Sequence, residues 1–569
     1  MAEGYPERAK QSDVIESDGP SDEYDDAERN YQPRSLKFWT ILIGMYLAMF
    51  LVALDRTIIA IPLAAITNEF GSIQDIGWYG SAYMLTNACF TPVFGRIYKL
   101  YSTKWVFLSS IVVFEVGSAL CGAAPNSPAF VVGRAIAGIG AAGIFAGGTM
   151  LMVPLIPIRK RPIFISMSGM IFALSSVLGP LIGGTLTDNV SWRWCFYINL
   201  PIGSFTFLSV LTFFRFDPPR TQTLCLPAQI KQLDPIGFFF FAPSMVSLIL
   251  ALQWGGSVEF PWSSPRIIGL LVTFAVLFAV FVAVEVMMPD TAMAPTRVVL
   301  NRSIAGSMVF MFLLSGGMMC IAYYLSIWFQ AAQGQSAVQA GIRSLPLVLG
   351  LTVMGIVVAV FTQKTGYYTP GLLLSPIISS VGAGLLTTLH PDSERGEWIG
   401  YQALYGLGIG CGFQTSMMPA QNILQRADVP LGISLMFFMQ QLGGAIFLSV
   451  AQNLFSNKLV EQLSGVAGLD PQSIINTGAT DLRRVVPSDE IDAVVDAYSF
   501  ALTRVFLLSA ALSAVMILGA VVVEWKSIKK ESNVEKSEEG TQPSVKNERV
   551  FEEGGKQSGS VSDNAKTEG

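Results

Sequence analysis

Charged residues inside apolar stretches are the first candidates for chemistry in this sequence. Asp55 and Arg56 occur within LVALDRTIIAIPLAAI, and Arg134 opens GRAIAGIGAAGIFAGG. Inside a membrane such a charge costs several kcal/mol unless it is paired or faces water, so each is a candidate functional residue. At 1.5 Å per residue, we expect Asp55 roughly 12 Å and Arg134 roughly 5 Å from the outer boundary, a difference that an arginine side chain can cover. A pair between Asp55 and either arginine that only fixes helix orientation is the alternative interpretation.

Uncharged polar residues and one glutamate extend this set. Glu115 lies near the middle of the apolar run 104–124, roughly 16 Å from its end; it could bind a second proton, but we favour a structural hydrogen bond to a neighbouring helix. The polar side chains expected to face a central cavity are Asn87, Tyr323, Tyr324, Gln330, Gln414, Gln440 and Gln441. Their mixture with Phe and Met favours an amphipathic organic solute over a sugar or an inorganic ion. Hydrogen bonds that only join helices are the alternative for each.

Residue patterns typical of enzymes and metal sites are not found. Six cysteines are scattered through the chain, and the single histidine, His390, has no other ligand types near it, so we expect no metal site. Gly138, Gly140 and Gly143 fit the spacing G-x-G-x-x-G, but a dinucleotide site needs a preceding strand, and none is predicted. With no clustered carboxylates or cysteines either, the sequence predicts neither an enzyme nor a bound cofactor.

The composition indicates an all-α membrane protein with many spans. Of 569 residues 51% are hydrophobic and 14% charged, and the mean hydropathy is +0.51. Such values require most of the chain to be apolar. The net charge of −5, without a basic patch, argues against nucleic-acid binding. Fourteen apolar runs are predicted to span the membrane: 38–63, 77–98, 104–124, 130–153, 162–186, 195–215, 233–252, 266–286, 303–330, 337–361, 370–389, 398–423, 430–455 and 501–523.

The distribution of cations orients these spans. With the amino terminus inside, thirteen Lys and Arg fall in inner loops and about six in outer loops. We therefore expect both termini in the cytoplasm and the connection 456–499 outside. Asn189 begins an outer Asn-Val-Ser glycosylation motif, which lies so close to the membrane that little modification is expected.

Two segments of the chain repeat. AIAGIGAAGIF, at 135–145, echoes ALYGLGIGCGF, at 403–413, with Gly138 and Gly140 falling on Gly406 and Gly408. These runs are eight spans apart. Two six-helix bundles separated by two extra helices would give this spacing.

The run 162–186 carries small residues at helical spacing. Gly179 and Gly183 are four apart, with Pro180 and Gly184 beside them, which favours close packing against another helix. The two pairs resemble the antiporter motif of the major facilitator superfamily. The following WRWCFYINLPIG resembles the fungal members of its fourteen-spanner drug:proton antiporter branch.

That resemblance implies roles for the charged residues. LDRTIIAIP resembles the first-helix motif of this branch, and Arg134 matches the arginine thought to assist proton transfer, so Asp55 and Arg134 are expected to couple protons to transport. In the loop after the second span, Gly95 and Lys104 match the family pattern of a gating loop, whereas Lys99 stands where an aspartate is usual. This departure puts in doubt a gating salt bridge built from that aspartate. The alternative is that the cations are simple inner anchors.

The resemblance also implies the fold and the function: a major facilitator fold of two six-helix bundles plus two extra helices, acting as a proton-coupled exporter of a small amphipathic toxin, secondary metabolite or drug. An importer or uniporter, for example of siderophores or amino acids, is the alternative, and a membrane enzyme or receptor is less favoured. We expect a monomer in contact with lipid, protons and a small molecule, in the plasma membrane or alternatively the vacuolar membrane. The expected divisions are disordered tails at 1–37 and 526–569, bundles at 38–215 and 301–525, the latter with an outer loop at 456–500, and linker helices within 216–300.

Overall fold

The computed structural model describes residues 31–59, 62–70, 76–158, 160–214, 229, 231–256, 260–464 and 490–528. Most of both predicted tails and much of the predicted outer loop at 456–500 therefore lie outside the described residues. So do Cys225 and five of the cations counted in the predicted loops, namely the inner Arg159, Arg215 and Arg220 and the outer Arg483 and Arg484. Below, "inner" denotes the side that the sequence predicts to be cytoplasmic.

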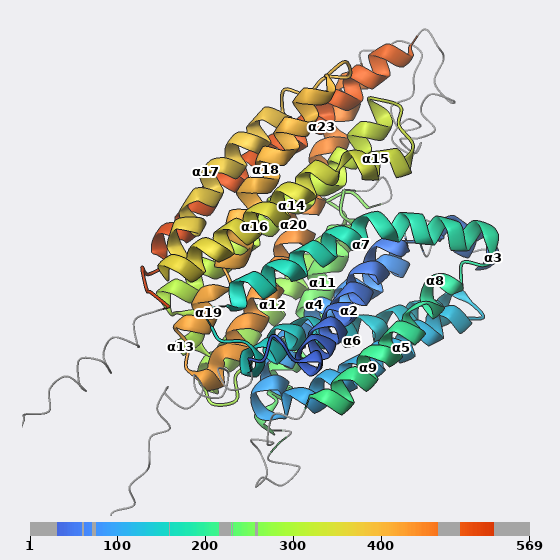
Figure 1. Cartoon of the computed structure of the whole chain (residues 1–569). Coiled ribbons are helices and arrows are strands. Elements are labelled where there is room, and N and C mark those ends of the chain that lie inside the picture. The colour runs from blue at the N-terminus through green and yellow to red at the C-terminus, as the bar shows by residue number, and fades with distance from the viewer. Residues whose placement is uncertain are drawn as a thin grey trace, which may run out of the picture. The chain divides into compact units, whose positions relative to one another are not determined.

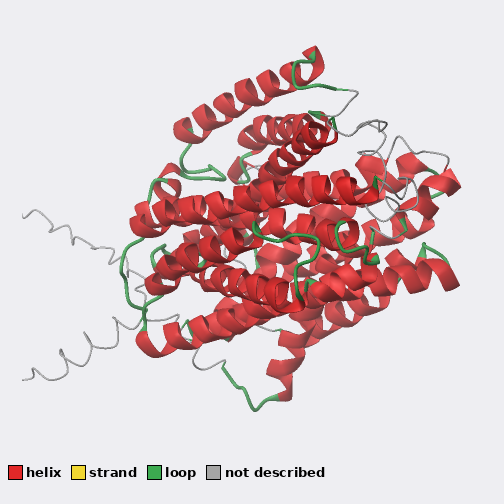
Figure 2. Cartoon of the chain, turned by 90° about the horizontal axis from the view of Figure 1, so that it is seen from above, coloured by secondary structure: helices red, strands yellow, loops and turns green. Residues whose placement is uncertain are grey.

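Helices form nearly all of the described secondary structure, with one isolated β-bridge between Tyr367 and Ser527 (Figure 2). The first half of the chain contains α2 (Leu36–Ile58), α3 (Leu63–Phe70), α4 (Ile76–Leu100), α5 (Thr103–Ala123), α6 (Ser127–Leu155), α7 (Arg161–Asn189), α8 (Trp194–Tyr197) and α9 (Asn199–Phe213). Then come α11 (Pro235–Trp254), α12 (Pro265–Met287) and α13 (Thr296–Val299). The second half contains α14 (Arg302–Ala331), α15 (Ala337–Arg343), α16 (Leu345–Thr365), α17 (Thr369–Leu386), α18 (Arg395–Thr415), α19 (Met418–Asn422), the 3₁₀ turn η2 (Arg426–Asp428), α20 (Val429–Leu463) and α23 (Ile491–Val522) (Figure 1).

The predicted all-α membrane fold is confirmed. Eleven segments of the described chain have the length and hydropathy of a membrane span. Three further helices, α4, α7 and α18, with 25, 29 and 21 residues, lie where the second, fifth and twelfth spans are predicted. Their glycines and polar residues lower their hydropathy, as is typical of helices that pack against other helices and away from lipid.

Several helix ends differ from the predicted runs. The first span ends at Ile58 and not at residue 63, because the residue before Pro62 is disfavoured in a helix. The tenth span begins at Leu345, after the short helix α15. α20 has 35 residues and is about 52 Å long, well beyond the roughly 30 Å of a hydrocarbon core.

The repeated glycines occupy matching places in the two halves. A Cβ on Gly140 would overlap the backbone of Phe114, and one on Gly408 would overlap the backbone of Ser379. α6 therefore lies directly against α5, and α18 lies in the same way against α17. Only glycine permits two backbones to come this close.

The other repeated pair packs against a different neighbour, again in matching fashion. A Cβ on Gly138 would overlap the carbonyl of Tyr83 in α4, and one on Gly406 would overlap the carbonyl of Leu347 in α16. In each half, one glycine-rich helix therefore packs against the two spans that precede it: α6 packs against α4 and α5, and α18 packs against α16 and α17. The sequence repeat is therefore also a structural repeat.

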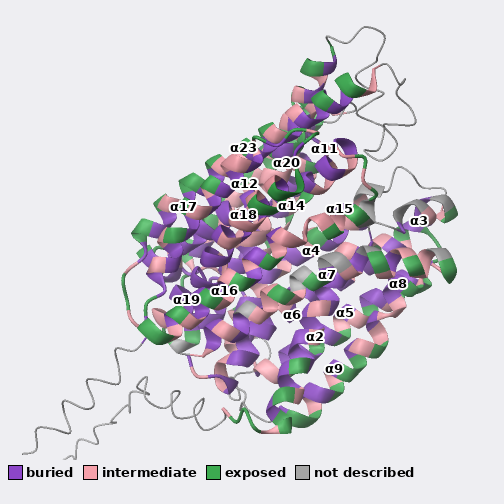
Figure 3. Cartoon of the chain, turned by 45° about the horizontal axis from the view of Figure 1, so that its top comes forward, coloured by how far each residue is buried: buried purple, intermediate pink, exposed green. Residues whose placement is uncertain are grey.

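The two extra helices differ from each other in burial. α11 packs on α12, α4 and α20, and its Phe241 ring lies 5.0 Å from Phe281 of α12 and 5.4 Å from Phe438 of α20. In the most apolar window of α12 the mean hydropathy is 3.0, yet only 11% of that window is buried. A helix that is apolar and exposed is suited to lipid contact. Figure 3 shows buried and exposed stretches side by side along the helices of the chain.

Candidate functional site

Asp55 of α2 and Arg134 of α6 form an ion pair. Arg134 Nη1 donates to Asp55 Oδ2 at 2.6 Å, and the two side chains are 1% and 0% exposed. Arg134 Nε donates to the carbonyl of Tyr79 at 2.9 Å, and the guanidinium lies 4.5 Å from the centre of the Tyr83 ring. Asp55 Oδ1 has no hydrogen-bond partner among the described residues. One carboxylate oxygen is therefore held by the arginine, and the other is buried without a partner in the part of the chain that the structure describes.

Arg56 takes part in a different set of contacts. Its Nη1 donates to Gln441 Oε1 at 3.4 Å, and Gln441 Nε2 donates to Asn87 Oδ1 at 2.8 Å. Adjacent residues on a helix point about 100° apart, so Arg56 cannot share the Arg134 side of α2 with Asp55. These two hydrogen bonds join α2 and α4 of the first half to α20 of the second. Asn87 and Gln441, both expected to face a cavity, are thus brought together, and Arg56 bonds to Gln441 and not to Asp55, the partner considered for it from the sequence.

The glycines of the 162–186 run pack against the same part of α2. A Cβ on Gly179 would overlap Thr57 Oγ1, and one on Gly183 would lie 3.0 Å from the carbonyl oxygen of Ile58. Thr57 Oγ1 also donates to the carbonyl of Ser175 at 3.0 Å. The predicted close approach of another helix at this face is confirmed, and the partner is α2, just after Asp55. The side chain of Pro180 lies outside the described part of the chain, and the neighbouring Gly184 is partly buried.

The inner end of α20 is bound by two cations. Lys99 Nζ of α4 donates to Asp428 Oδ1 at 2.7 Å, and Arg297 Nη2 of α13 donates to the same atom at 3.0 Å. We call these three residues the Asp428 clasp. Beside it, a Cβ on Gly95 would overlap the side chain of Ser434, so α4 and α20 are in close contact. The aspartate usual at position 99 is absent, but an ion pair of the reverse polarity joins the two halves here.

Neither Asp428 nor its connection to Arg297 was predicted. Asp428 comes directly before the Val-Pro that opens α20, and an aspartate before a helix with proline in its first turn is a frequent signal of a helix start. That signal marks where α20 begins, but it does not identify the residues that bind the Asp428 carboxylate. Lys104, the third residue of the predicted gating loop, lies elsewhere: its Nζ donates to the carbonyl of Leu211 in α9 at 2.7 Å.

The extra helices are tied to the inner end of α4. Arg96 Nε donates to the carbonyl of Gln232 at 2.7 Å, and its Nη2 donates to the carbonyl of Asp290. Gln232 lies three residues before the start of α11, and Asp290 lies three residues after the end of α12. Asp234 Oδ1 in turn caps α11 by accepting from the amide of Gly237 at 2.8 Å. The linker is therefore attached to α4 through Arg96 and to α20 through the Asp428 clasp.

The remaining residues expected in a cavity do not form one cluster. Tyr324 is fully buried, and its hydroxyl donates to Gln452 Oε1 at 2.9 Å, whereas the neighbouring Tyr323 is 54% exposed. Gln330 Nε2 donates to the carbonyl of Ser326 in its own helix at 3.1 Å. These contacts fit the alternative of hydrogen bonds within and between helices.

The two other predicted glutamines lie on α18 and α20. Gln414 is 3% exposed, and its Oε1 has no partner among the described residues. The carbonyl of Gln440 accepts from Ser315 Oγ at 2.6 Å. Asn189, the predicted glycosylation residue, is exposed at the outer end of α7, and its Nδ2 donates to the carbonyl of Thr185 at 2.9 Å.

The favoured interpretation of Glu115 is wrong. A structural hydrogen bond was expected, but both carboxylate oxygens are buried without a partner among the described residues. The reason is that Glu115 faces α9 at Gly203, which has no side chain to bond with.

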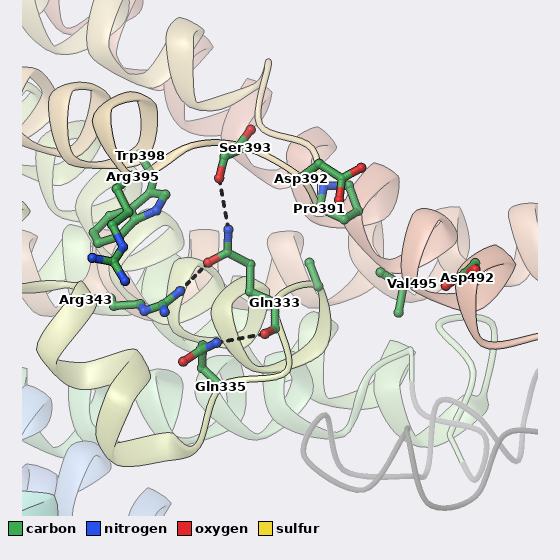
Figure 4. A pocket seen from close by; sticks show the side chains of 11 residues that line it. Gln333, Gln335, Arg343, Pro391, Asp392, Ser393, Arg395, Trp398, Asp492 and Val495 are labelled. Atoms are coloured by element: carbon green, nitrogen blue, oxygen red, sulfur yellow. Dashed lines mark hydrogen bonds between the residues drawn. The ribbon is translucent and has the colours of Figure 1, made fainter. Parts of the chain in front are cut away.

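A polar pocket of about 400 Å³ lies at the outer end of the second half (Figure 4). Arg343 Nη1 donates to Gln333 Oε1, and Gln333 Nε2 donates to the carbonyl of Ser393 at 3.4 Å. The Arg343 guanidinium also lies 5.6 Å from the Trp398 ring. Hydrogen bonds among Arg343, Gln333 and Ser393 hold the lining of this pocket together. Neither Asp55 nor Arg134 lines it.

A family comparison matches most of the chain. The profile described as Major Facilitator Superfamily matches residues 45–448. Among curated proteins, an "MFS-type efflux pump MFS1" of Arthroderma benhamiae is 46% identical over 496 residues, covering 87% of this chain and 92% of that protein. An "Efflux pump aflT" of Aspergillus parasiticus is 45% identical, covering 88% of this chain and 98% of that protein. An "Efflux pump roqT" of Penicillium rubens is 43% identical, covering 93% and 98%.

A solved structure shares the fold. The human organic anion transporter MFSD10 (TETRAN) matches with a TM-score of 0.53 and 14% sequence identity, covering 84% of this chain and 99% of that one. At this identity the match concerns the arrangement of helices alone.

Proposed function

The chain belongs to the major facilitator superfamily, and from this premise we propose that it exports a small amphipathic organic compound in exchange for protons. It is a transporter and not an enzyme, like the efflux pumps to which it is similar. The proposal beyond this concerns proton coupling, the direction of transport and the residues that perform it.

One observation carries the proposal of proton coupling: the buried pair of Asp55 and Arg134 leaves Asp55 Oδ1 without a partner among the residues that the structure describes. A buried carboxylate beside an arginine favours its charged form. If the pair separates, that charge becomes costly in a low-dielectric site, and Asp55 takes up a proton at Oδ1 or Oδ2. Separation and protonation are thus coupled, which is what an antiporter requires.

The helix contacts supply a route from this pair to a movement of the two halves. α7 packs on Thr57 and Ile58, the residues that follow Asp55 by two and three positions. α7 also contacts α16 of the second half. A shift of α7 against α16 therefore moves the end of α2 and changes the distance between Asp55 and Arg134. In our proposal this links the occupancy of the central site to the protonation of Asp55.

The Asp428 clasp supplies the gate on the inner side. Lys99 comes from the first half, Arg297 from the linker and Asp428 from the second half, so opening this side breaks both bonds. Alternating access requires such bonds to exchange with others on the outer side. Lys99 and Gly95 fit the gating role, whereas Lys104 braces α5 against α9.

The other components stay proposals of the same kind. The polar chain of Arg56, Gln441 and Asn87 lies between the two halves and is our candidate for part of the substrate site. We propose a monomer in the plasma membrane, with the vacuolar membrane as the alternative. We keep the bundles 38–215 and 301–525 with the linker within 216–300 as the units that move.

Transport in proteoliposomes tests the proposal. Purified protein is reconstituted, and uptake of a panel of amphipathic compounds, including the dye rhodamine 6G, is measured with and without a pH gradient. We expect accumulation driven by the gradient, and its loss in Asp55→Asn, which keeps the shape of the side chain but cannot titrate. Asp492→Asn, at an exposed position in the outer pocket, is the matched control and should transport normally.

Other results of the proteoliposome assay would indicate other functions. Uptake that equilibrates without regard to the gradient indicates a uniporter. Gradient-driven accumulation with the compound and the proton moving in the same direction indicates an importer. Normal coupled export by Asp55→Asn would make the buried pair a structural feature only.

A further inference from the structure

A second site lies away from the central pair, in a groove between α5 and α9. Its volume is about 460 Å³. The walls are formed mainly by apolar side chains, among them Ile111, Val112, Val116, Phe207 and Leu208, and Glu115 is the one charged residue type among them. Volumes of roughly 300–1,000 Å³ are typical of small-molecule sites.

The groove opens toward the membrane. Val112 and Val116 are 46% and 48% exposed, and Leu208 on the opposite wall is 57% exposed. α5 packs chiefly on α6, α9 and α8 of the first half. In a protein with this many apolar spans, such an exposed apolar surface faces lipid.

Glu115 lies at the floor of this groove with its hydrogen-bonding capacity unused. Both of its carboxyl oxygens are buried and have no partner among the described residues. A Cβ on Gly203 of α9 would overlap Oε1, so the absence of a side chain there makes room for the carboxyl group. An unpaired charge at this depth costs several kcal/mol, so Glu115 is a neutral acid with an O–H to donate.

The depth of Glu115 limits what can bind. It is eight residues from the outer end of α5, or about 12 Å along the helix axis. A phospholipid headgroup stays at the membrane surface and does not reach this level. A compound dissolved in the hydrocarbon region does.

We propose that this groove binds a lipophilic compound with a basic nitrogen, taken up from the bilayer. The compound enters from the bilayer as its neutral base, the Glu115 side chain turns toward the groove, and its carboxyl O–H donates to the nitrogen lone pair, while the apolar body of the compound fills the space between α5 and α9. An alcohol or an alkane of the same size fills the groove but is a weaker acceptor or none, so the nitrogen gives the selectivity. Neither Asp55 nor Arg134 lines this groove, and the proposal does not depend on the proposed export mechanism.

Photolabelling of the purified protein in lipid nanodiscs tests the inference without any transport measurement. The probe is dodecylamine carrying a diazirine, compared with the matching diazirine-bearing dodecanol, and adducts are located by peptide mass spectrometry. We expect the amine to label peptides of α5 and α9 at least tenfold more than the alcohol does. Unlabelled dodecylamine should compete with the probe, and unlabelled dodecanol should not.

Two variants sharpen the test. Glu115→Met keeps the length of the side chain but has no O–H, and should reduce labelling by the amine at least tenfold. Val276→Met on the exposed face of α12 is the control for a change on the lipid-facing surface and should leave labelling unchanged.

The inference is overturned if amine and alcohol label the groove equally, or if Glu115→Met is labelled as strongly as the unchanged protein. Cross-links that join two copies of the chain at α5 and α9 overturn it as well, since the groove would then be an interface. If Glu115→Met does not fold, the competition between amine and alcohol on the unchanged protein still decides.

Discussion

Removing Lys99 should open the inner side of the transporter. Lys99 and Asp428 belong to different halves, and their side chains are only 16% and 6% exposed. Lys99→Ala removes the less exposed partner of the Asp428 carboxylate and leaves Arg297, whose side chain is 64% exposed, as its remaining partner. The form with the inner side closed is therefore destabilised relative to the open one.

The magnitude follows from these exposures. A hydrogen bond to a charged group contributes about 1.5–3 kcal/mol, which is a shift of about 10- to 150-fold in the equilibrium between the two forms. An exposed ion pair contributes about 0–1 kcal/mol, so Arg297→Ala should shift the same equilibrium less than about fivefold. The more decisive part of the prediction is the ranking, in which Lys99→Ala shifts the equilibrium more than Arg297→Ala does.

A buried reporter near the clasp makes the shift measurable. Ser434 is fully buried beside Gly95, so a cysteine at this position, in a chain whose native cysteines are replaced, reacts with a membrane-impermeant maleimide only when α4 and α20 separate. Lys104→Ala is the matched control. It removes a cation from the same loop, but its bond to Leu211 lies within the first half.

Equal labelling in Lys99→Ala and Lys104→Ala would refute this reasoning. A stronger test exchanges the charges, with Lys99→Asp and Asp428→Lys in an Arg297→Ala background, because Arg297 would otherwise face the new lysine. This variant should label as slowly as Arg297→Ala alone. Rapid labelling would mean that the clasp acts through something other than the ion pair.

Three further predictions concern other contacts. Arg134→Ala should reduce coupled transport severely and Arg134→Lys should reduce it partially, and combining Arg134→Ala with Asp55→Asn should be no worse than the single variants in the proteoliposome assay; additive losses would separate the two residues. Gly183→Val should lower the free energy of unfolding by about 1–3 kcal/mol, measured as a lower Tm, while Gly384→Val, where a Cβ meets nothing within 4 Å, serves as control. Hydrogen bonds from Trp192 and Arg193 hold the pKa of the Glu69 carboxyl below its ordinary value of 4.5, so its stabilising contribution is present above that value and lost as the pH falls through the lowered pKa. The Tm difference between the unchanged protein and Glu69→Gln should therefore shrink below pH 4.5, and a constant difference would contradict this.

The buried ion pair was within reach of the sequence because a charge in an apolar run needs a partner. Asp55 and Arg134 each stand out in their runs, and they are opposite charges whose difference in depth an arginine side chain can cover. Arg56 was harder to place, since its direction depends on the rotation of α2 relative to its neighbours.

Contacts between distant elements could not be predicted, because nothing in the local sequence requires a particular partner. Lys99 and Asp428 are 329 positions apart, and no local pattern says that α4 and α20 touch. Glu115 was misinterpreted because its surroundings on α9 include a glycine, and one sequence does not show which residue faces which. The helices themselves were predictable from hydropathy, while their ends depended on local signals such as Pro62 after the first span.

The glycine packing described for the two halves bears on how the protein is made. α4, α5 and α6 follow one another along the chain, as do α16, α17 and α18, so each tightly packed trio forms from neighbours in order of synthesis. Domains generally fold as units during translation, the amino-terminal one first. The first trio can therefore assemble in the membrane while the second half is still on the ribosome. The Asp428 clasp, in contrast, cannot close until α20 has been inserted, which makes it a late event in biogenesis.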